Sequence, residues 1–281
     1  MKLSIITINY NNAEGLRKTL TSVASQTYKQ IEHIIVDAAS TDGSVEVIKE
    51  YVNEARYDVI WSSEKDKGIY DGMNRGIKKA TGDYVWILNS GDSAAAGDVV
   101  EQMMNVLAVG RIDILSGNIV RICDNKKEYA PLPVKREKDK KPRPMDVSML
   151  TFYTATIPQD AAFVQRELYE KYGYFDDKMK ICADWKLYLN MIALGGVQPM
   201  YVNIDVVLFD MTGVSNANNE LRLLERKVYL DDVLPASVLK DYDAYHFTIE
   251  EYNRLKKYHL WGVVYFMERV LFKLEKWHVL S

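Results

Sequence analysis

The sequence has few cysteines, no long apolar run and no excess of charge of one sign. Its two cysteines, Cys123 and Cys182, are too few and too far apart for a disulfide framework or a thiolate zinc site, so a reducing, cytoplasmic environment is expected. No stretch of about 18 apolar residues occurs, and no segment is therefore expected to span a bilayer. The N-terminal residues 1–10 have the pattern of a strand rather than of a signal peptide.

The charge balance and two missing motifs exclude further classes. With 36 Lys and Arg against 39 Asp and Glu, the net charge of −3 does not suit a general nucleic-acid-binding protein. There is no G-x-G-x-x-G after a strand and no G-x-x-x-x-G-K-[ST], so neither the usual dinucleotide fold nor a P-loop is supported. What is present, 281 residues of which 48% are hydrophobic and 27% charged, is typical of one large globular domain or two closely joined ones.

Short β-rich runs alternate with helical patterns in the first third of the chain. Strands are predicted at Leu3–Ile8, Ile31–Asp37, Val59–Ser62 and Tyr84–Leu88. This alternation predicts right-handed βαβ crossovers and a parallel sheet, whose ligands bind beyond the carboxyl ends of the strands. The polar residues expected at that edge are Asn9, Tyr10, Asp37, Ser40, Asp42, Asp66, Lys67, Asn89, Ser90 and Asp92.

The segment Lys126–Arg143 is rich in basic residues. It contains eight basic residues, three acidic ones and three prolines without an apolar period, which predicts a mobile loop. A solvated surface excursion is the favoured interpretation, and a lid over an anionic ligand is the alternative. Beyond it, helices are predicted at Arg166–Tyr172 and Ala183–Leu194 and a strand at Met200–Leu208.

The C-terminal segment Arg254–Trp277 has the pattern of one continuous amphipathic helix. Its apolar stripe consists of Leu260, Val263, Met267, Val270, Leu274 and Trp277. The stripe alone is most simply explained by core packing. The opposite face mixes aromatic and basic residues, which also suits a helix in a membrane interface, and an oligomer contact would have the same pattern.

Asp37, at the end of the second predicted strand, suggests recognition of a base. Its carboxylate could accept a hydrogen bond from an imide N–H, a donor that uracil has and cytosine lacks. The site would then select a uridine nucleotide. The alternative is a helix N-cap or turn aspartate.

Six short motifs resemble those of one enzyme family. They are Ser4–Asn11, Ser25–Tyr28, Ile34–Gly43, Asp66–Gly76, Ala80–Tyr84 and Leu88–Asp92. Together they resemble the family 2 glycosyltransferases of the GT-A fold, densely as far as Asp92 and more loosely to Ser215. The resemblance implies an α/β fold, a Rossmann-like nucleotide-diphospho-sugar transferase fold with a mostly parallel central sheet flanked by helices and a C-terminal helical extension. It further implies inverting transfer of a sugar from a nucleotide-sugar donor to an acceptor hydroxyl, aided by Mg²⁺ or Mn²⁺.

The resemblance assigns the donor site residue by residue. The donor-binding positions are Thr7, Asn9, Tyr10, Asp37, Asp66, Lys67, Ser90 and Gly91. Asp37 matches the base-binding aspartate, and Lys67 either complements a phosphate or base carbonyl or is an ordinary surface lysine. Gly91 replaces the first of two adjacent acids common in the family. Asp92 is therefore expected to bind the metal as the single protein carboxylate, with donor diphosphate and water as the other ligands.

The acceptor side is assigned in the same way. Asp184 resembles the catalytic aspartate that takes the proton of the acceptor hydroxyl, and an ordinary helix N-cap is the alternative. Trp185 either stacks on the acceptor sugar or packs. Gln159 and Asp160 follow a proline where many relatives have His-Gln, so they are assigned to acceptor binding and a role that needs an imidazole is absent. Thr212–Ser215 resembles a flexible Gly-Ser loop near the donor site of the family and, with the basic segment from Lys126, is a candidate lid element; disorder is the alternative.

The expected activity is transfer of a hexosyl or N-acetylhexosaminyl group from a UDP-sugar. The expected acceptor is a lipid-linked saccharide, such as a polyprenyl-diphosphate-linked one, in capsule, O-antigen or exopolysaccharide synthesis at the inner face of a bacterial plasma membrane. A soluble or protein-bound acceptor is the runner-up. A catalytically inactive nucleotide-sugar-binding module, suggested by Gly91, is the alternative from another class. The expected subdomains are 1–115 for the donor, 116–232 for the acceptor and 233–281 as a helical extension in contact with membrane or a second copy.

Overall fold

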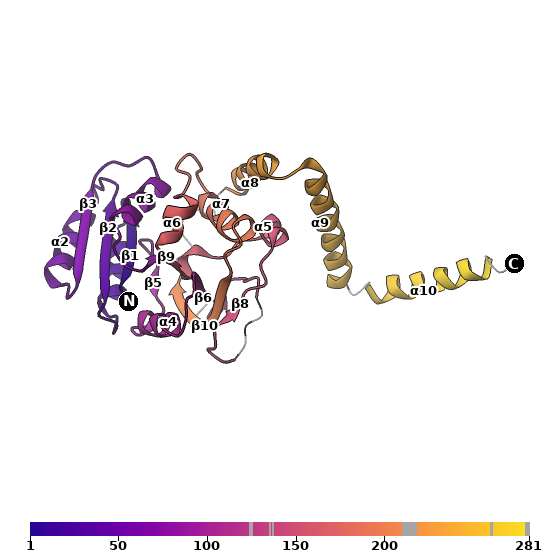
Figure 1. Cartoon of the computed structure of the whole chain (residues 1–281), viewed down its shortest axis with the longest axis horizontal. Coiled ribbons are helices and arrows are strands. Elements are labelled where there is room, and N and C mark those ends of the chain that lie inside the picture. The colour runs from indigo at the N-terminus through magenta and orange to yellow at the C-terminus, as the bar shows by residue number, and fades with distance from the viewer. Residues whose placement is uncertain (124–125, 135, 137, 210–217, 259–260, 279–281) are drawn as a thin grey trace. The chain divides into compact units, whose positions relative to one another are not determined.

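The computed structural model describes residues 1–281 except 124–125, 135, 137, 210–217, 259–260 and 279–281. The chain divides into two compact units, Met1–Lys227 and Val228–Ser281. The first is an α/β structure on one mixed sheet, and the second is helical (Figure 1). The predicted segment Thr212–Ser215 lies outside the described residues.

The described residues of the first unit contain a ten-stranded sheet with the order β3-β2-β1-β4-β9-β6-β10-β5, in which β7 pairs with β6 and β8 with β10. The strands are β1 Leu3–Asn9, β2 Ile31–Asp37, β3 Asp58–Ser63, β4 Tyr84–Ile87, β5 Ser93–Ala94, β6 Ile114–Cys123, β7 Lys126–Tyr129, β8 Arg143–Pro144, β9 Ala162–Gln165 and β10 Pro199–Leu208. Strands β1 to β4 are parallel, as predicted, whereas β9 is antiparallel to both β4 and β6. The α/β fold prediction is confirmed.

Helices connect the strands and extend beyond them. In the first unit they are α1 Ala13–Ala24, α2 Ser44–Glu54, α3 Ile69–Lys79, α4 Val99–Leu107, α5 Met149–Thr154, the 3-10 turn η1 Gln159–Ala161, α6 Glu167–Tyr172, α7 Ala183–Tyr188 and the π-helical η2 Leu189–Leu194. Helix α8, Asn219–Val233, crosses the boundary between the units. The predicted helices at Arg166–Tyr172 and Ala183–Leu194 are therefore present, the second as α7 continued by η2.

The apolar periodicity of the sequence marks the buried faces. In α1, Leu16, Leu20 and Val23 are 0%, 2% and 0% exposed, as their spacing predicts. Helix α3 approaches β1 so closely that a Cβ at Gly76 would lie 2.4 Å from Cγ2 of Ile6. Glycine at this position therefore allows the helix to lie directly on the strand that leads to Asn9.

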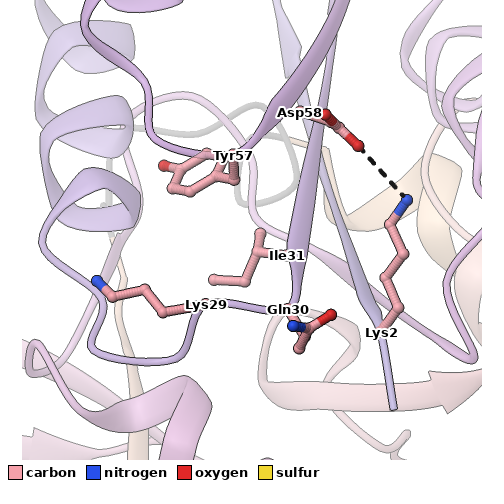
Figure 2. A pocket seen from close by; sticks show the side chains of 6 residues that line it. All are labelled: Lys2, Lys29, Gln30, Ile31, Tyr57 and Asp58. Atoms are coloured by element: carbon pink, nitrogen blue, oxygen red, sulfur yellow. Dashed lines mark ion pairs between the residues drawn. The ribbon is translucent and has the colours of Figure 1, made fainter.

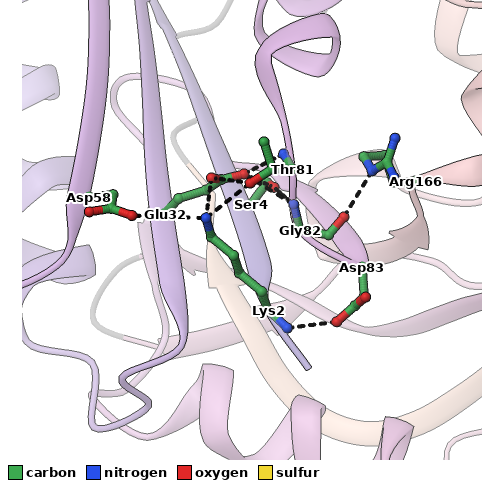
Figure 3. Close-up of polar contacts among 8 residues, drawn as sticks. All are labelled: Lys2, Ser4, Glu32, Asp58, Thr81, Gly82, Asp83 and Arg166. Atoms are coloured by element: carbon green, nitrogen blue, oxygen red, sulfur yellow. Dashed lines mark hydrogen bonds and ion pairs between the residues drawn. The ribbon is translucent and has the colours of Figure 1, made fainter.

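A buried carboxylate joins the amino ends of β1 and β2 to the α3–β4 turn (Figure 3). Glu32 is 1% exposed and accepts hydrogen bonds from Ser4 Oγ at 2.5 Å and from Thr81 N at 2.6 Å. Lys2 Nζ lies 2.6 Å from its second oxygen. Burial alone would raise the pKa of Glu32, but the interactions with Lys2, Ser4 and Thr81 outweigh it and lower the pKa to about 2. The network therefore fixes the register of this edge.

A pocket of about 310 Å³ opens beside this network (Figure 2). Its lining residues are Lys2, Lys29, Gln30, Ile31, Tyr57 and Asp58. Because Ile31 and Asp58 are the first residues of β2 and β3, the pocket lies at the amino ends of the parallel strands. It is thus at the edge opposite to the one where ligands of parallel sheets bind.

The basic segment Lys126–Arg143 differs from its prediction as a mobile loop. The loop prediction is wrong at both ends of the segment, because Lys126–Tyr129 forms a strand that pairs with β6 and Arg143 pairs with β10. Lys127 Nζ lies 3.2 Å from Asp205, and Arg136 Nε donates to Asn118 at 3.1 Å. Acidic and polar side chains of other strands thus bind these basic side chains. Because the partners are distant in the sequence, the local pattern does not reveal them.

The second unit contains the end of α8, α9 Ala236–Lys257 and α10 Trp261–His278. The prediction of one helix over Arg254–Trp277 is wrong, because α9 ends at Lys257 and α10 begins at Trp261. Of the predicted stripe, Val263, Met267 and Val270 are 55%, 57% and 40% exposed. Leu260 and the side chains of Leu274 and Trp277 lie outside the described residues. Among the described residues, no helix is long and apolar enough to cross a bilayer.

Candidate active site

The carboxyl ends of the parallel strands bring polar side chains together, as predicted. The pairing register aligns Asn9 of β1 with Asp37 of β2, and Asp37 with Ser63 of β3. Asn9 Nδ2 donates to Asp37 Oδ1 at 2.8 Å, and Ser63 Oγ donates to Oδ2 at 2.6 Å. Three strands are thereby linked through one carboxylate at this edge.

Asp37 also closes the loop that follows β2. Ser40 donates its backbone N–H to Oδ2 at 2.9 Å and its hydroxyl to Oδ1 at 2.6 Å. Burial alone would raise the pKa of Asp37, but hydrogen bonds from Ser40, Ser63 and Asn9 hold it below its ordinary value. Asp37 is 0% exposed and its acceptor positions are occupied by protein donors. The turn interpretation therefore describes its contacts here, and direct base contact stays a prediction.

The other residues assigned to the nucleoside differ in exposure. Thr7 is fully buried, with its hydroxyl donating to Leu88 O at 2.8 Å and bonded to His33 Nε2 at 2.9 Å, so it joins strands rather than lining a surface. Tyr10 is 66% exposed at the strand end. Asn9 is 4% exposed, and its Oδ1 has no hydrogen-bond partner among the described residues. Asn9 thus retains a buried acceptor that sequence reasoning did not single out.

The second donor segment, Asp66 and Lys67, lies in the loop that leads into α3. Asp66 accepts a hydrogen bond from Gly68 N at 3.0 Å, and Lys67 donates its backbone N–H to Asp71 at 3.1 Å. The residue Lys67 is exposed. The hydrogen bonds of this segment thus hold the backbone of the loop. A role of the Lys67 side chain toward a phosphate stays a prediction.

In the segment after β4, the backbone conformation explains why Gly91 stands where the family often has an acidic residue. Gly91 has a φ of +105°, a conformation that residues with a Cβ rarely adopt, so an aspartate at this position would be strained. Its N–H donates to Thr19 Oγ1 at 3.0 Å, and its carbonyl accepts from Lys18 Nζ at 2.9 Å. Ser90 is held through Asn12, which donates to its Oγ at 3.3 Å. Asp92, 5% exposed, is the segment's carboxylate.

Asp160 lies within electrostatic reach of both Asp92 and Asp184. Desolvation, then the charges of Asp92 and Asp184, raise the pKa of Asp160 well above its ordinary range. Asn89 Nδ2 donates to Asp160 Oδ1 at 3.3 Å, while Asn89 Oδ1 is buried without a partner among the described residues. No cluster of three or more His, Cys, Asp or Glu side chains with metal-binding geometry occurs in the described part of the chain. The concentration of negative charge is nevertheless a feature of this site.

Asp184 lies in the first turn of α7. Cys182, not Asp184, is the N-cap, so the N-cap interpretation of Asp184 is wrong. Tyr70 donates its hydroxyl to Asp184 Oδ1 at 3.2 Å and to Ile181 O at 2.6 Å. Burial raises the pKa of Asp184 above its ordinary value, against the lowering effects of the Tyr70 hydrogen bond and the Arg226 charge. A carboxylate with a raised pKa is suited to proton transfer.

The remaining acceptor-side residues are mostly buried. Trp185 is 1% exposed, and its indole N–H donates to Phe152 O at 2.7 Å. The prediction that Trp185 stacks on a sugar is therefore wrong. The ring packs in the interior, which was the alternative interpretation. Gln159 is 7% exposed, and its Nε2 has no partner among the described residues. Sequence reasoning missed Tyr70. It lies in the motif Asp66–Gly76, but nothing in that motif indicates its partner Asp184, more than a hundred residues away.

Comparison with solved structures defines the class of this fold. TarS of S. aureus in complex with UDP-GlcNAc superposes with a TM-score of 0.63 at 18% identity, over 84% of this chain and 69% of that one. A mannosyltransferase of Pyrobaculum calidifontis in complex with GDP-Man and Mn²⁺ gives 0.56 at 19% identity, over 80% and 60%. The chain also spans 60% of the UDP complex of TarS 1–349. The fold is that of the GT-A glycosyltransferases.

The sequence comparisons identify the family. The chain belongs to glycosyl transferase family 2, whose model matches residues 4–173. It is 32% identical over 219 residues to an uncharacterised glycosyltransferase of Mycobacterium tuberculosis, covering 76% of this chain and 77% of the relative. It is 24% identical over 225 residues to a PGL/p-HBAD biosynthesis glycosyltransferase of Mycobacterium bovis, covering 79% and 82%. The resemblance drawn from the motifs is thus confirmed at the level of family and fold.

Proposed function

We propose that the protein is an inverting, metal-assisted glycosyltransferase that moves a hexosyl or N-acetylhexosaminyl group from a UDP-sugar to an acceptor hydroxyl. The observation that carries the proposal is the grouping of Asp92, Asp160 and Asp184. Burial, and then the charges of Asp92 and Asp184, raise the pKa of Asp160. A metal-side carboxylate and a base-side carboxylate are the two groups that direct displacement at an anomeric carbon requires. Family membership supports the reaction class.

The donor base binds at Asn9, Asp37 and Tyr10. Asn9 Oδ1, an acceptor without a partner among the described residues, is suited to the uracil imide N–H. Asp37 orients the Asn9 amide through its Nδ2. The exposed Tyr10 ring can stack on the base. Asp66 and Lys67 are proposed to face the donor phosphates. TarS, a member of the same fold class, has been solved with UDP, which supports a uridine donor here.

The residues near Asp92 fit a divalent cation. Asn89 Oδ1 is a buried oxygen with no partner among the described residues. Burial, and then the charges of Asp92 and Asp184, raise the pKa of Asp160, and a cation would offset those charges. Mg²⁺ and Mn²⁺ prefer such oxygen ligands and commonly bind through one or two carboxylates plus phosphate oxygens. Asp92, with Asn89 three residues before it, would hold the ion, which would neutralise the charge developing on the departing diphosphate.

Asp184 acts as the general base. It takes the proton of the acceptor hydroxyl, whose oxygen forms the new bond to the anomeric carbon while the bond to the diphosphate breaks and UDP leaves with both electrons. Attack from the opposite face inverts the anomeric configuration. Tyr70 holds the carboxylate through its hydroxyl at 3.2 Å. Gln159 and Asp160 are proposed to bind acceptor hydroxyls, which is supported by a Gln159 Nε2 that has no hydrogen-bond partner among the described residues.

The acceptor is proposed to be a lipid-linked saccharide in cell-surface polysaccharide synthesis at the inner face of the plasma membrane. The support is the exposure of large apolar side chains on α10, with Phe266 at 66% and Phe272 at 60%. Such side chains, interleaved with Arg269, suit an interfacial helix. A homodimer contact would cover the same residues. The similarity to a relative named as a PGL/p-HBAD biosynthesis glycosyltransferase supports a role in biosynthesis of this kind.

Asp184→Asn tests the reaction. Transfer should fall at least about 100-fold, the scale of general-base catalysis, because an amide cannot take the proton. Calorimetric binding of UDP with Mn²⁺ should be unchanged. Asp177→Asn, an acid seven residues away on the same segment, is the matched control and should retain activity. Retained turnover in Asp184→Asn would remove it from the base role, and UDP binding without turnover in the wild type would favour the inactive binding module.

A further inference from the structure

The loop that leads into α7 is held by a residue far away in the sequence. Glu225 of α8 accepts hydrogen bonds from three successive backbone N–H groups: from Lys180 at 2.6 Å to Oε1, and from Ile181 at 3.1 Å and Cys182 at 2.9 Å to Oε2. Successive N–H groups of this kind form a concave site for an anion. A single side chain thus fixes the backbone over the residues just before the catalytic helix.

The same backbone segment orients Asp184. The carbonyl of Ile181 accepts the Tyr70 hydroxyl at 2.6 Å, and that hydroxyl also lies 3.2 Å from Asp184 Oδ1. Cys182 is the N-cap of α7 and its side chain makes no cap hydrogen bond, so the helix start depends on partners outside the helix. A continuous set of contacts therefore runs from Glu225 through the backbone of 180–182 and Tyr70 to the carboxylate.

Two further contacts attach α8 to the same region. Cys182 Sγ lies 3.5 Å from Arg222 O, and the Arg226 guanidinium lies 5.2 Å from the centre of the Trp185 ring. Arg222, Glu225 and Arg226 of α8 thus contact the loop before α7 and the first turn of α7. Glu220, in the first turn of α8, is exposed and takes no part in the contacts described here.

We infer that Glu225 is a positioning residue for the general base, holding the 180–182 backbone so that Tyr70 and Asp184 keep their catalytic geometry. This inference rests on the proposed function of Asp184. Because α8 continues to Val233, beyond the end of the first unit at Lys227, the residue that fixes the catalytic segment belongs to the helix that joins the two units.

Glu225→Ala and Glu225→Gln test the inference, with Glu220→Gln as the matched control on the same helix. For Glu225→Ala, kcat should fall about 10- to 100-fold, the usual effect of a misplaced catalytic group. The KM for the donor and the calorimetric affinity for UDP with Mn²⁺ should stay within about twofold, since donor contacts are not involved. Glu225→Gln keeps one acceptor oxygen and should regain part of the rate. Amides of residues 180–182 should exchange hydrogen faster in Glu225→Ala.

The acid limb of the kcat profile separates positioning from folding. The groups that lower the pKa of Asp184 are the Trp185 backbone N–H, the Tyr70 hydroxyl and the Arg226 charge. Asp160, Cys182 and Tyr188 also lie within electrostatic reach of it. Loss of the Tyr70 contact should move the limb to higher pH. An unchanged limb with kcat lowered only in proportion to folded protein would mean a structural role and overturn the inference. If Glu225→Ala does not fold, the profile of Glu225→Gln decides.

A double variant distinguishes failure of this inference from failure of the proposed function. In an Asp184→Asn background, Glu225→Ala should cause no further loss, because residues that act as a unit are not additive. Full turnover of Glu225→Ala alongside an inactive Asp184→Asn would overturn the positioning role alone. Full turnover of Asp184→Asn would instead overturn the assignment of the base.

Discussion

Replacing the buried Glu32 with glutamine tests the network that holds the amino ends of β1 and β2. The pKa of Glu32 is lowered from 4.5 to about 2. This difference corresponds to about 3 kcal/mol of stabilisation of the charged form, and allowance for the partly exposed Lys2 reduces it to about 2 kcal/mol. Since the folded pKa is the lower one, this stability is fully present above pH 4.5 and is lost as the pH falls towards 2.

Urea unfolding at several pH values measures this contribution. Glu32→Gln should be less stable than the wild type by about 2 kcal/mol at pH 7, and the difference should shrink as the pH is lowered from 5 towards 2. Glu50→Gln is the control, because Glu50 is 61% exposed in its ion pair with Arg17. Its loss should stay below about 1 kcal/mol. A Glu32→Gln difference that is independent of pH would refute the role of the buried charge.

Three further predictions concern the site. Gly91→Asp should lower the melting temperature without tightening Mn²⁺-dependent UDP binding, because its φ of +105° is strained for aspartate; calorimetry showing tighter binding at unchanged stability would contradict this. Tyr70→Phe should lower kcat about tenfold, as expected for loss of one charge-assisted hydrogen bond, and should move the acid limb of its pH profile upward, since the Tyr70 hydrogen bond lowers the pKa of Asp184; an unmoved limb would show that Tyr70 does not act on the base. Deleting residues 261–281 should release the protein from anionic vesicles in flotation assays while UDP affinity is retained; continued vesicle binding would exclude α10 as the membrane contact.

The sequence predicts the donor half of the fold well. Periodicity and turn residues are local signals, so the parallel strands β1 to β4 and the buried face of Leu16, Leu20 and Val23 follow from it. The antiparallel insertion of β9 between β4 and β6 depends on pairing between distant segments, which no local pattern encodes. For the same reason the short strands at Lys126 and Arg143 were predicted as loop.

Motif resemblance finds the residues of the site but not their contacts. Asp184 and Asp92 carry a pattern, whereas Tyr70 and Glu225 gain their importance only from partners on distant elements. Burial is likewise a tertiary property, which is why the Trp185 ring, next to the base in sequence, proves to be packed. Asp37 shows the same limit, because the motif does not reveal that its carboxylate oxygens already accept hydrogen bonds from Asn9, Ser40 and Ser63.

Calorimetric titration with UDP, GDP and CMP, each with and without Mn²⁺, tests the central claim most directly. The account predicts selective binding of UDP that Mn²⁺ strengthens, and loss of the Mn²⁺ effect in Asp92→Ala. A panel of UDP-sugars would then rank the donor. Absence of nucleotide binding, or equal affinity for the three nucleotides with no effect of Mn²⁺, would contradict a metal-assisted UDP-sugar transferase.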